Sequence, residues 1–475
     1  MKRELAFLPL WRARRRAAKG RLTPGPVLRG SCRSGIGREA FGIRSISMVA
    51  ALCACAPTTV EAQTAPASPT PQTAPPASPT PAETPPAAGP PPPPPTFAQA
   101  GPWSFTGVIN VDALDNIAGG LKSGPAVLVK GALSAAYDGS QQGHDGLTGL
   151  VSAQYVNGTR FSGHFVGDTQ GLDNIEASGA IRLYEVWLAH DYHSSTRGWK
   201  AGLIDLNSEF DTQETAGLFL NSSDGVGAEL GHSGVNGPSI FPTTALGTTF
   251  YLRPSSALTF RLGIFDGTAG SPAHPGRFAV HLSGRDGILA IGQVERRVDD
   301  RFRVEGGLWA YSARFDDLHR VDDQGNPVRE RRSRGGYVLI EGKLASIGDG
   351  DDRGLSGWVR MGIADPVVQT VSSYTGAGLV LTGALKQRPS DQAGIAINRA
   401  IVDDGDPVNS LRRPETTIET TYRYNATDWL AVQPDAQLIF RPGGSATVPT
   451  AFAVGLRFNI TLTKNLVARL KSQAP

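Results

Sequence analysis

The residue types best suited to chemistry are arginines and carboxylates that alternate with apolar residues along much of the chain. Planar guanidinium groups and carboxylates make directed, charge-assisted hydrogen bonds, and they therefore suit a ligand rich in hydroxyl groups. Side chains of a strand point alternately to its two faces, so such residues share a polar face opposite an apolar one. The candidates on these polar faces are Arg261, Arg303, Glu305, Arg360, Glu419, Arg423, Asp435, Arg441 and Arg457.

A second set of candidates lies in residues 207–246, where no alternation is sustained. The segment is acidic and aromatic, and its candidate residues are Glu209, Phe210, Asp211, Phe219, Asp224 and Glu229. A connection of this length inside a compact domain is usually functional. We therefore expect this segment to contribute to the site.

Signals for catalysis, metals or cofactors are weak. Residues 225–231 only approximate a dinucleotide-binding motif, and no strand–helix–strand context surrounds them. His190 and His193 have no further cluster of metal ligands beside them, and no Ser/His/Asp order or pair of carboxylates stands out. All three cysteines precede residue 63, which excludes a thiolate metal site or a Cys nucleophile in the remainder. We expect no enzyme, no metal and no cofactor.

The charge of the chain is unevenly distributed. The whole sequence carries 46 Lys and Arg against 43 Asp and Glu, a net charge of +3. Residues 1–62 alone have a net charge of +9, so residues 63–475 have a net charge of −6. An acidic body argues against a nucleic-acid-binding protein, which would present a basic face.

The elements that position the candidates are predicted to be strands. Alternation is clearest in residues 418–425, 430–441 and 452–460, and about sixteen such stretches fall between residues 103 and 460. A soluble β-sandwich would also alternate, but its polar faces are often rich in Lys and Glu. Here the polar faces hold Gly, Arg, Gln and Asp, which suits a wet interior. We predict an all-β fold: a transmembrane antiparallel β-barrel of about 16 strands with long extracellular loops.

The regions outside the predicted barrel have a different composition. A basic stretch, an apolar run and a small-x-small site predict a secretory signal peptide over residues 1–62, with a lipid-modified Cys55 as the alternative. The basic stretch is unusually long, which indicates either an extended signal or a true start further along the chain. Residues 63–102 are rich in Pro and read as an extended linker. Residues 103–460 form the barrel, and 461–475 form a C-terminal tail.

Several ordered blocks of this sequence are similar to one family. They are residues 200–211, 216–223, 238–242 and 251–254, followed by 413–422, 432–435 and 441–444. Together they resemble the carbohydrate-selective outer-membrane porin family (the porin B type) of Gram-negative bacteria. The resemblance covers roughly residues 103–460 and is best in 199–267 and 413–458.

This resemblance implies a sixteen-stranded barrel in the outer membrane that passes glucose and similar sugars by facilitated diffusion, usually as a trimer. Its expected partners are small carbohydrates, outer-membrane lipid and lipopolysaccharide, and the barrel-assembly machinery, which would read Phe458 in place of a terminal aromatic residue. Lipopolysaccharide phosphates would meet the arginines of residues 329–334, unless that loop is simply solvated.

Two sets of alternatives stay open. Residues 207–246 either fold into the barrel and narrow it or pack over the rim or against a neighbouring subunit. The function is either sugar-selective transport, general diffusion, an enzymatic or adhesive role at the surface, or sugar binding by a secreted protein.

Overall fold

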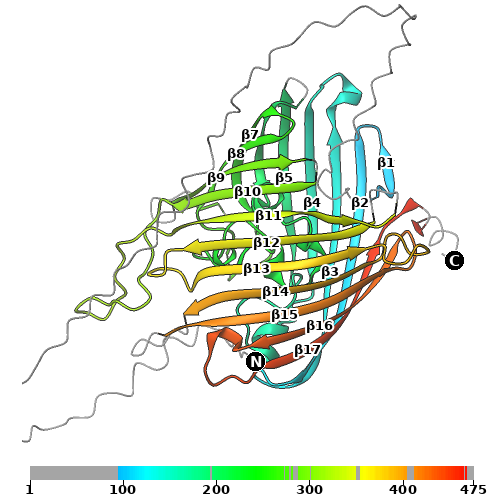
Figure 1. Cartoon of the computed structure of the whole chain (residues 1–475). Coiled ribbons are helices and arrows are strands. Elements are labelled where there is room, and N and C mark those ends of the chain that lie inside the picture. Colours follow the sequence, from blue (N-terminus) through cyan, green and yellow to red (C-terminus); the bar gives the residue numbers. More distant parts are fainter. Residues whose placement is uncertain are drawn as a thin grey trace, which may run out of the picture. The chain divides into compact units, whose positions relative to one another are not determined.

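The computed structural model describes residues 95–467, apart from 193–194, 272, 278–279, 282–286, 300, 349–352, 404–410 and 465. It is drawn in Figure 1. The predicted signal peptide, nearly all of the predicted linker and most of the predicted tail lie outside the described residues. The first described strand, β1 (Ala98–Ala100), falls in the stretch predicted as linker and pairs with the strand that follows it.

Sixteen longer strands follow β1. In chain order they are β2 (Trp103–Ala118), β3 (Gly124–Asp138), β4 (Leu147–Val156), β5 (Ala180–Tyr192), β6 (Arg197–Ile204), β7 (Ala245–Ser255), β8 (Leu258–Asp266), β9 (Ile288–Val298), β10 (Phe302–Tyr311), β11 (Arg334–Ser346), β12 (Gly354–Ala364), β13 (Val371–Thr382), β14 (Gln392–Asp403), β15 (Arg412–Asn425), β16 (Leu430–Phe440) and β17 (Ala451–Thr461).

These sixteen strands form one closed antiparallel barrel. Each strand from β2 to β17 pairs with its neighbours in the chain, and β17 pairs with β2 to close the sheet. The closing register joins Phe452 with Ala118 at one end and Thr461 with Val108 at the other. Closure leaves no free edge in the wall, which every membrane-spanning sheet requires. The prediction of a sixteen-stranded antiparallel barrel is confirmed.

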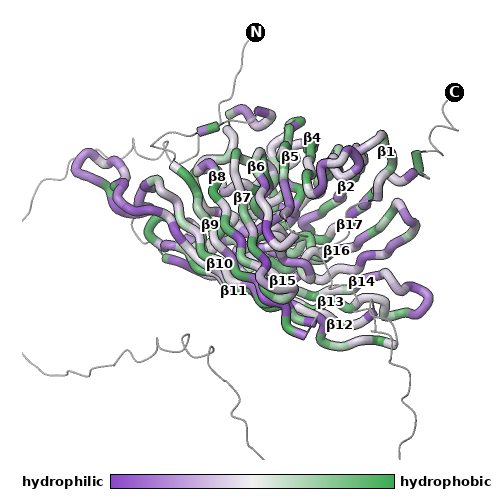
Figure 2. The backbone as a smooth tube through the Cα atoms, turned by 90° about the horizontal axis from the view of Figure 1, so that it is seen from above, coloured by the Kyte–Doolittle hydropathy of each residue, from purple (hydrophilic) through white to green (hydrophobic). Residues whose placement is uncertain are grey.

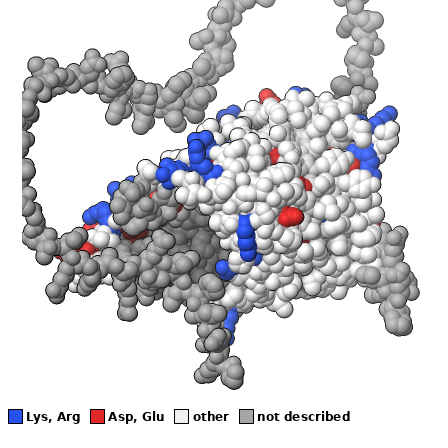
Figure 3. All heavy atoms as spheres, turned by 90° about the horizontal axis from the view of Figure 1, so that it is seen from below, with Lys and Arg blue, Asp and Glu red and all other residues white. Residues whose placement is uncertain are grey.

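The two faces of the wall differ as the alternation predicted. Aliphatic side chains point outward, among them Leu308, which is 75% exposed, and Ile363, which is 67% exposed. The intervening residues, such as Arg303, Glu305 and Arg360, point inward and are buried. Figure 2 shows hydrophobic and hydrophilic segments alternating along the strands, and Figure 3 shows a face on which uncharged atoms predominate.

The loops divide by length between the two ends of the barrel. One end holds short turns, such as 256–257 between β7 and β8. The other end holds the long connections 157–179, 205–244, 267–287 and 312–333. In outer-membrane barrels the short turns face the periplasm and the long loops face outward. We call the second end the outer rim.

The interior is filled by side chains of the wall and of the long connections. The largest buried apolar cluster joins wall residues such as Phe265, Trp309 and Tyr337 to Phe210 and Leu230 of residues 205–244. A short α-helix, α1 (Ala228–Gly231), lies in this connection. No helix of the described residues is long and apolar enough to cross a membrane.

Candidate functional site

Residues 205–244, which we call the inner loop, are bound to the barrel wall by a buried ion cluster. Arg360 of β12 donates from Nε to Asp211 Oδ1 at 2.7 Å and from Nη2 to Asp211 Oδ2 at 2.8 Å. The same guanidinium donates from Nη2 to Glu229 Oε1 at 2.7 Å and from Nη1 to Glu229 Oε2 at 3.0 Å. All three side chains are fully buried. One arginine thus joins two distant points of the inner loop to the wall.

Two glycines make room for this cluster. A Cβ atom on Gly362 would lie 1.9 Å from Glu229 Oε1, and one on Gly227 would lie 1.9 Å from Arg360 Nη1. Tyr337 and Tyr374 flank the guanidinium, with its central carbon 5.1 and 5.4 Å from their ring centroids. Aromatic faces at this distance stabilise a cation. The wall is therefore shaped around the ion cluster on several sides.

A second contact lies further along the inner loop, at its residues 212–215. Glu341 of β11 accepts hydrogen bonds from the backbone N–H groups of Glu214 at 3.1 Å and Thr215 at 2.7 Å. Arg303 of β10 binds both Glu341 and the carbonyl oxygen of Thr212. Glu341 and Arg303 thereby bind two N–H groups and one carbonyl oxygen of the loop backbone.

A third contact is made by β14, β15 and β16. Glu419 accepts from the backbone N–H groups of Leu220 at 2.6 Å and Asn221 at 3.1 Å. Gln433 Nε2 donates to the carbonyl oxygen of Leu218 at 2.7 Å, and Asn398 Nδ2 donates to Asp224 Oδ2 at 2.9 Å. Because inward-facing residues from β10 to β16 hold the inner loop, it lies inside the barrel and not over its rim.

A second connection also folds inward, and the sequence analysis missed it. Residues 157–179, which we call the short inner loop, bind Arg457 of β17 through Asp173 Oδ1, an acceptor at 3.0 Å from Nη2. Glu415 of β15 accepts from the backbone N–H groups of Thr169 at 2.8 Å and Gln170 at 2.9 Å. The signal available in the sequence was the loss of alternation after Val156, the same signal that marked the inner loop.

The two inner loops also bind each other. The N–H group of Ser222 donates to the carbonyl oxygen of Gly171, and that of Asn174 donates to the carbonyl oxygen of Leu220, both at 2.8 Å. Asn174 Nδ2 donates to the carbonyl oxygen of Phe219 at 3.3 Å. The lumen is therefore narrowed by two segments that form one body.

Comparison with known proteins agrees with this geometry. The family model described as "Carbohydrate-selective porin, OprB family" matches residues 139–462. The chain belongs to this porin family. It is accordingly an outer-membrane β-barrel of a Gram-negative bacterium, and its family and fold are those of a channel.

Two individual proteins are similar to this porin. Porin B of Pseudomonas aeruginosa is 30% identical over 177 residues, which span 32% of this chain and 39% of the length of Porin B. The high-pH structure of Pseudomonas putida OprB matches with a TM-score of 0.67 and 20% identity, over 76% of this chain and 94% of that one. At this identity the structural match shows the shared fold.

Ion pairs connect the inward faces of β8–β11 in this porin, and they include the predicted residues Arg261, Arg303 and Glu305. We call them the charged ladder. Arg261 Nη1 binds Glu295 Oε2 at 2.8 Å, and their side chains are 17% and 7% exposed. Arg303 Nη1 lies 3.3 Å from Glu305 Oε2 and 3.8 Å from Glu295 Oε2. The ladder presents donors and acceptors side by side, with charges of both signs.

Several predicted residues do not belong to the polar lining of the barrel. Phe210 packs edge-on against Phe265, with ring centroids 6.4 Å apart, and Phe219 packs in a cluster with Trp358. Both phenylalanines are buried, so they fill the core of the porin. Arg441 follows the end of β16 with a positive φ of 51° and is exposed, so it does not belong to the polar face of a strand.

Three predicted residues face inward without joining an ion pair to the inner loop. Asp435 is buried and accepts from Gln437 Nε2 at 3.1 Å. Arg457 donates two hydrogen bonds to the carboxylate of Asp112, at 2.8 and 2.6 Å. Among the residues that the structure describes, Arg423 has no ion-pair or hydrogen-bond partner, which leaves its guanidinium available in the lumen.

Other inward groups were not predicted as lining residues. Lys200 pairs with the predicted Glu209 and lies 4.4 Å from the ring centroid of Trp187. Lys130 of β3 lies 4.4 Å from the ring centroid of Phe241, which belongs to the inner loop. Alternation does not reveal these contacts between a lysine and an aromatic ring, because the two residues of each contact lie on different strands or loops.

Burial changes the titration of carboxyl groups in both inner loops. The carboxylate oxygens of Asp168 are buried, and burial together with the neighbouring Glu415 and Glu176 raises the pKa of Asp168 to about 8. Burial also raises the pKa of Asp224 well above its ordinary value, although the hydrogen bond from Asn398 opposes the shift. In the described residues no group of three or more His, Cys, Asp or Glu side chains could hold a metal ion.

Proposed function

We propose that this porin passes small neutral sugars across the outer membrane by facilitated diffusion. The observation that carries the proposal is the inner loop, which the Arg360 cluster fixes across the lumen. A fixed constriction sets the pore diameter, and diameter together with lining groups determines selectivity. Family membership supports carbohydrate as the substrate class.

The groups that stay partly exposed suit neutral polar solutes. Arg261 with Glu295 and Lys200 with Glu209 are pairs of opposite charge, each partner at most 17% exposed. Such pairs offer hydrogen-bond donors and acceptors to hydroxyl groups while their net charge is zero. The rings of Trp187 and Phe241 supply flat apolar surfaces of the kind on which a sugar ring stacks. A channel with this lining favours sugars over ions of similar size.

Liposome swelling tests the proposal directly. Liposomes that contain the full-length protein should swell faster in glucose than in amino acids of similar size. Equal rates for all solutes would replace the proposal with a general diffusion porin. Absence of swelling in any solute would contradict a channel and favour a surface barrel with an enzymatic or adhesive role.

A loop deletion tests the constriction separately. Removing residues 214–222 eliminates the contacts with Glu341 and Glu419, and single-channel conductance should rise markedly. A deletion of similar length in the loop 312–333 is the matched control, because that loop lies at the outer rim. Unchanged conductance in the first deletion would contradict the constriction.

The proposal extends to assembly. We expect a homotrimer, from the family, and recognition of the last strand β17 by the barrel-assembly machinery. Chemical cross-linking of intact outer membranes tests the first expectation. Replacing Phe458 with Ala and measuring the folded fraction tests the second.

A further inference from the structure

The outward wall of the barrel is hollowed near the outer rim over β10, β11 and β12. In the register of these strands, Gly336 lies between Leu308 and Ile363. Both flanking side chains are strongly exposed, and Gly336 has no side chain, so a trough runs between them. Val338 and Met361 continue the trough toward the middle of the membrane. We call this hollow the rim trough.

Arginines lie at the upper end of the rim trough. Arg331 and Arg334 both line the hollow, together with Asp365. Arg331 Nη1 lies 3.2 Å from both carboxylate oxygens of Asp365, so its charge is compensated. Arg334 is exposed, and within the described residues its guanidinium has no hydrogen-bond or ion-pair partner. The upper end of the trough therefore carries an uncompensated positive charge.

The position of Arg334 matches a boundary between apolar and polar surface. It is the first residue of β11, and the outward residues that follow it on that strand are Gly336, Val338 and Ile340. Strand residues rise about 3.3 Å each, so Arg334 stands roughly 13 Å above Val338 along the strand. A molecule that fits has an anionic head at the level of Arg334 and an alkyl chain long enough to fill the trough.

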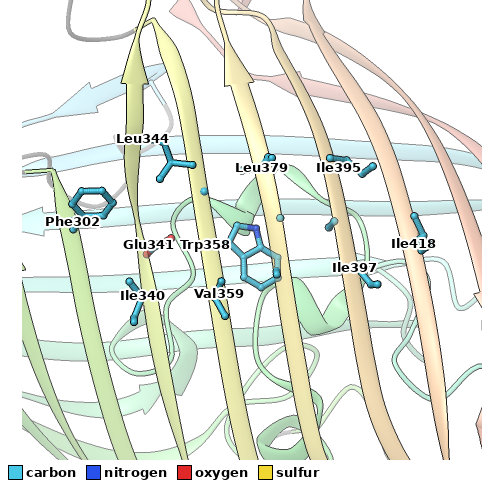
Figure 4. Close-up of a pocket in the computed structure, with 14 residues that line it drawn as sticks. Phe302, Ile340, Glu341, Leu344, Trp358, Val359, Leu379, Ile395, Ile397 and Ile418 are labelled. Carbon is cyan, nitrogen blue, oxygen red and sulfur yellow. The ribbon is translucent and has the colours of Figure 1, made fainter.

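A second groove on the same wall differs from the rim trough in having no arginine in its lining. It lies over β11 to β14, between side chains such as Leu344 and Ile395, and Ala377 lies at its base in register with Val359 and Ile397 (Figure 4). Its one charged lining residue is Glu341, whose carboxylate binds Arg303 and the inner loop. This groove has an apolar lining like the rim trough, but no Lys or Arg is among the residues that line it.

We propose that the rim trough binds a phosphorylated glycolipid of the outer leaflet, with one acyl chain along Gly336 and Val338 and a phosphate on Arg334. Charge complementarity selects this occupant, because a phosphate and an arginine that lacks another partner make a strong charge-assisted hydrogen bond. The long-loop end of the barrel faces the leaflet that holds such glycolipids.

The experiment measures lipid bound to the purified full-length protein by native mass spectrometry. The probes are bis-phosphorylated lipid A, dephosphorylated lipid A and phosphatidylglycerol. Arg334→Gln should lower the bound fraction of bis-phosphorylated lipid A by about tenfold, the typical effect of one charge-assisted hydrogen bond. Gly336→Leu, which fills the trough, should lower it similarly.

Two control variants separate this site from general effects. Arg320→Gln removes a rim arginine that is 64% exposed and pairs with Glu330, outside the trough. Ala377→Leu fills the second groove. Both should bind lipid A as the unaltered protein does, and the heat-dependent electrophoretic mobility of every variant should show a folded barrel.

Three results would overturn the proposal. One is unchanged lipid A binding by folded Arg334→Gln and Gly336→Leu variants. Another is equal binding of lipid A with and without its phosphates. The third is displacement of lipid A by an equal concentration of phosphatidylglycerol, which would assign the trough to ordinary phospholipid.

Discussion

The two inner loops enter the same lumen but differ in the balance of buried charges that holds each of them. For the inner loop, Arg360 of the wall binds two carboxylates of the loop and lies between two tyrosine rings. In the short inner loop, Asp168 lies near Glu176 and near Glu415 of the wall, and Asp173 shares Arg457 with Asp112. One loop depends on a paired cation, and the other carries an excess of carboxylates.

Because of this difference, the two loops should detach from the wall under different conditions. Removing one partner of a buried ion pair leaves an uncompensated charge, which is strongly destabilising. An excess of buried carboxylates is relieved by protonation instead. The inner loop should therefore respond to substitution of its cation, and the short inner loop should respond to pH.

The largest effect is expected for Arg360→Met. It leaves Asp211 and Glu229 buried without a cation, at a cost of roughly 3–5 kcal/mol. The inner loop should leave the wall, and single-channel conductance in planar bilayers should rise about twofold or more because the constriction widens.

A triple variant sharpens this prediction. Combining Arg360→Met with Asp211→Asn and Glu229→Gln removes the unpaired charges, so conductance should return toward that of the unaltered protein. If the single and triple variants conduct equally, the ion cluster does not hold the inner loop.

Arg457→Gln should have a smaller effect. It removes the cation bound to Asp112 and Asp173, but Glu415 still accepts two backbone hydrogen bonds from the short inner loop. Limited proteolysis should cut residues 157–179 faster, while the inner loop stays protected. Equal protection of both loops would mean that they do not differ in the way described above.

The pH prediction concerns Asp168, whose pKa rises to about 8 on burial. A carboxyl group with a raised pKa binds its proton more tightly in the folded state, so its contribution to stability falls as pH rises from about 4 to about 8. Hydrogen exchange of residues 157–179 should therefore be slower at pH 5 than at pH 8, by more than about tenfold after correction for intrinsic rates. Asp168→Asn should reduce the difference, and an unchanged pH dependence after this substitution would exclude Asp168 as a source of it.

The smallest effect is expected in the charged ladder. Arg261→Gln and Glu295→Gln each leave the inner loop bound, because neither residue contacts it in the ion cluster. Glucose-driven swelling should fall by about twofold, a change that corresponds to one weakened hydrogen bond. The double variant should restore charge balance and with it the ratio of glucose to amino-acid rates.

Much of the fold was predictable from the sequence, because alternation reports which face a strand residue occupies. Arg261, Arg303, Arg360 and Arg457 all lie on the inward face that alternation assigned to them. Arg441 does not, because the strand ends at Phe440 and the chain turns there. Alternation does not locate the end of a strand to a precision of one residue.

The site was harder to predict, for a different physical reason. The partners Arg360 and Asp211 are 149 positions apart, and Arg457 and Asp112 are 345 positions apart. No local pattern encodes such pairs. Phe210 and Phe219 were chosen as lining residues for their chemistry, yet the apolar clusters that bury them form only when the loop packs against the wall.

The seam between β17 and β2 has a consequence for how the barrel forms. Every other pairing among β2–β17 joins strands that are consecutive in the chain, so it can form by closing a single connection, of which 205–244 is the longest. The seam alone must join the two ends of the barrel sequence, and the Arg457–Asp112 pair lies on it. The entropy of cyclisation is therefore concentrated in one late step. Until β17 pairs with β2, these two strands have unpaired backbone edges, and the Arg457–Asp112 salt bridge cannot form.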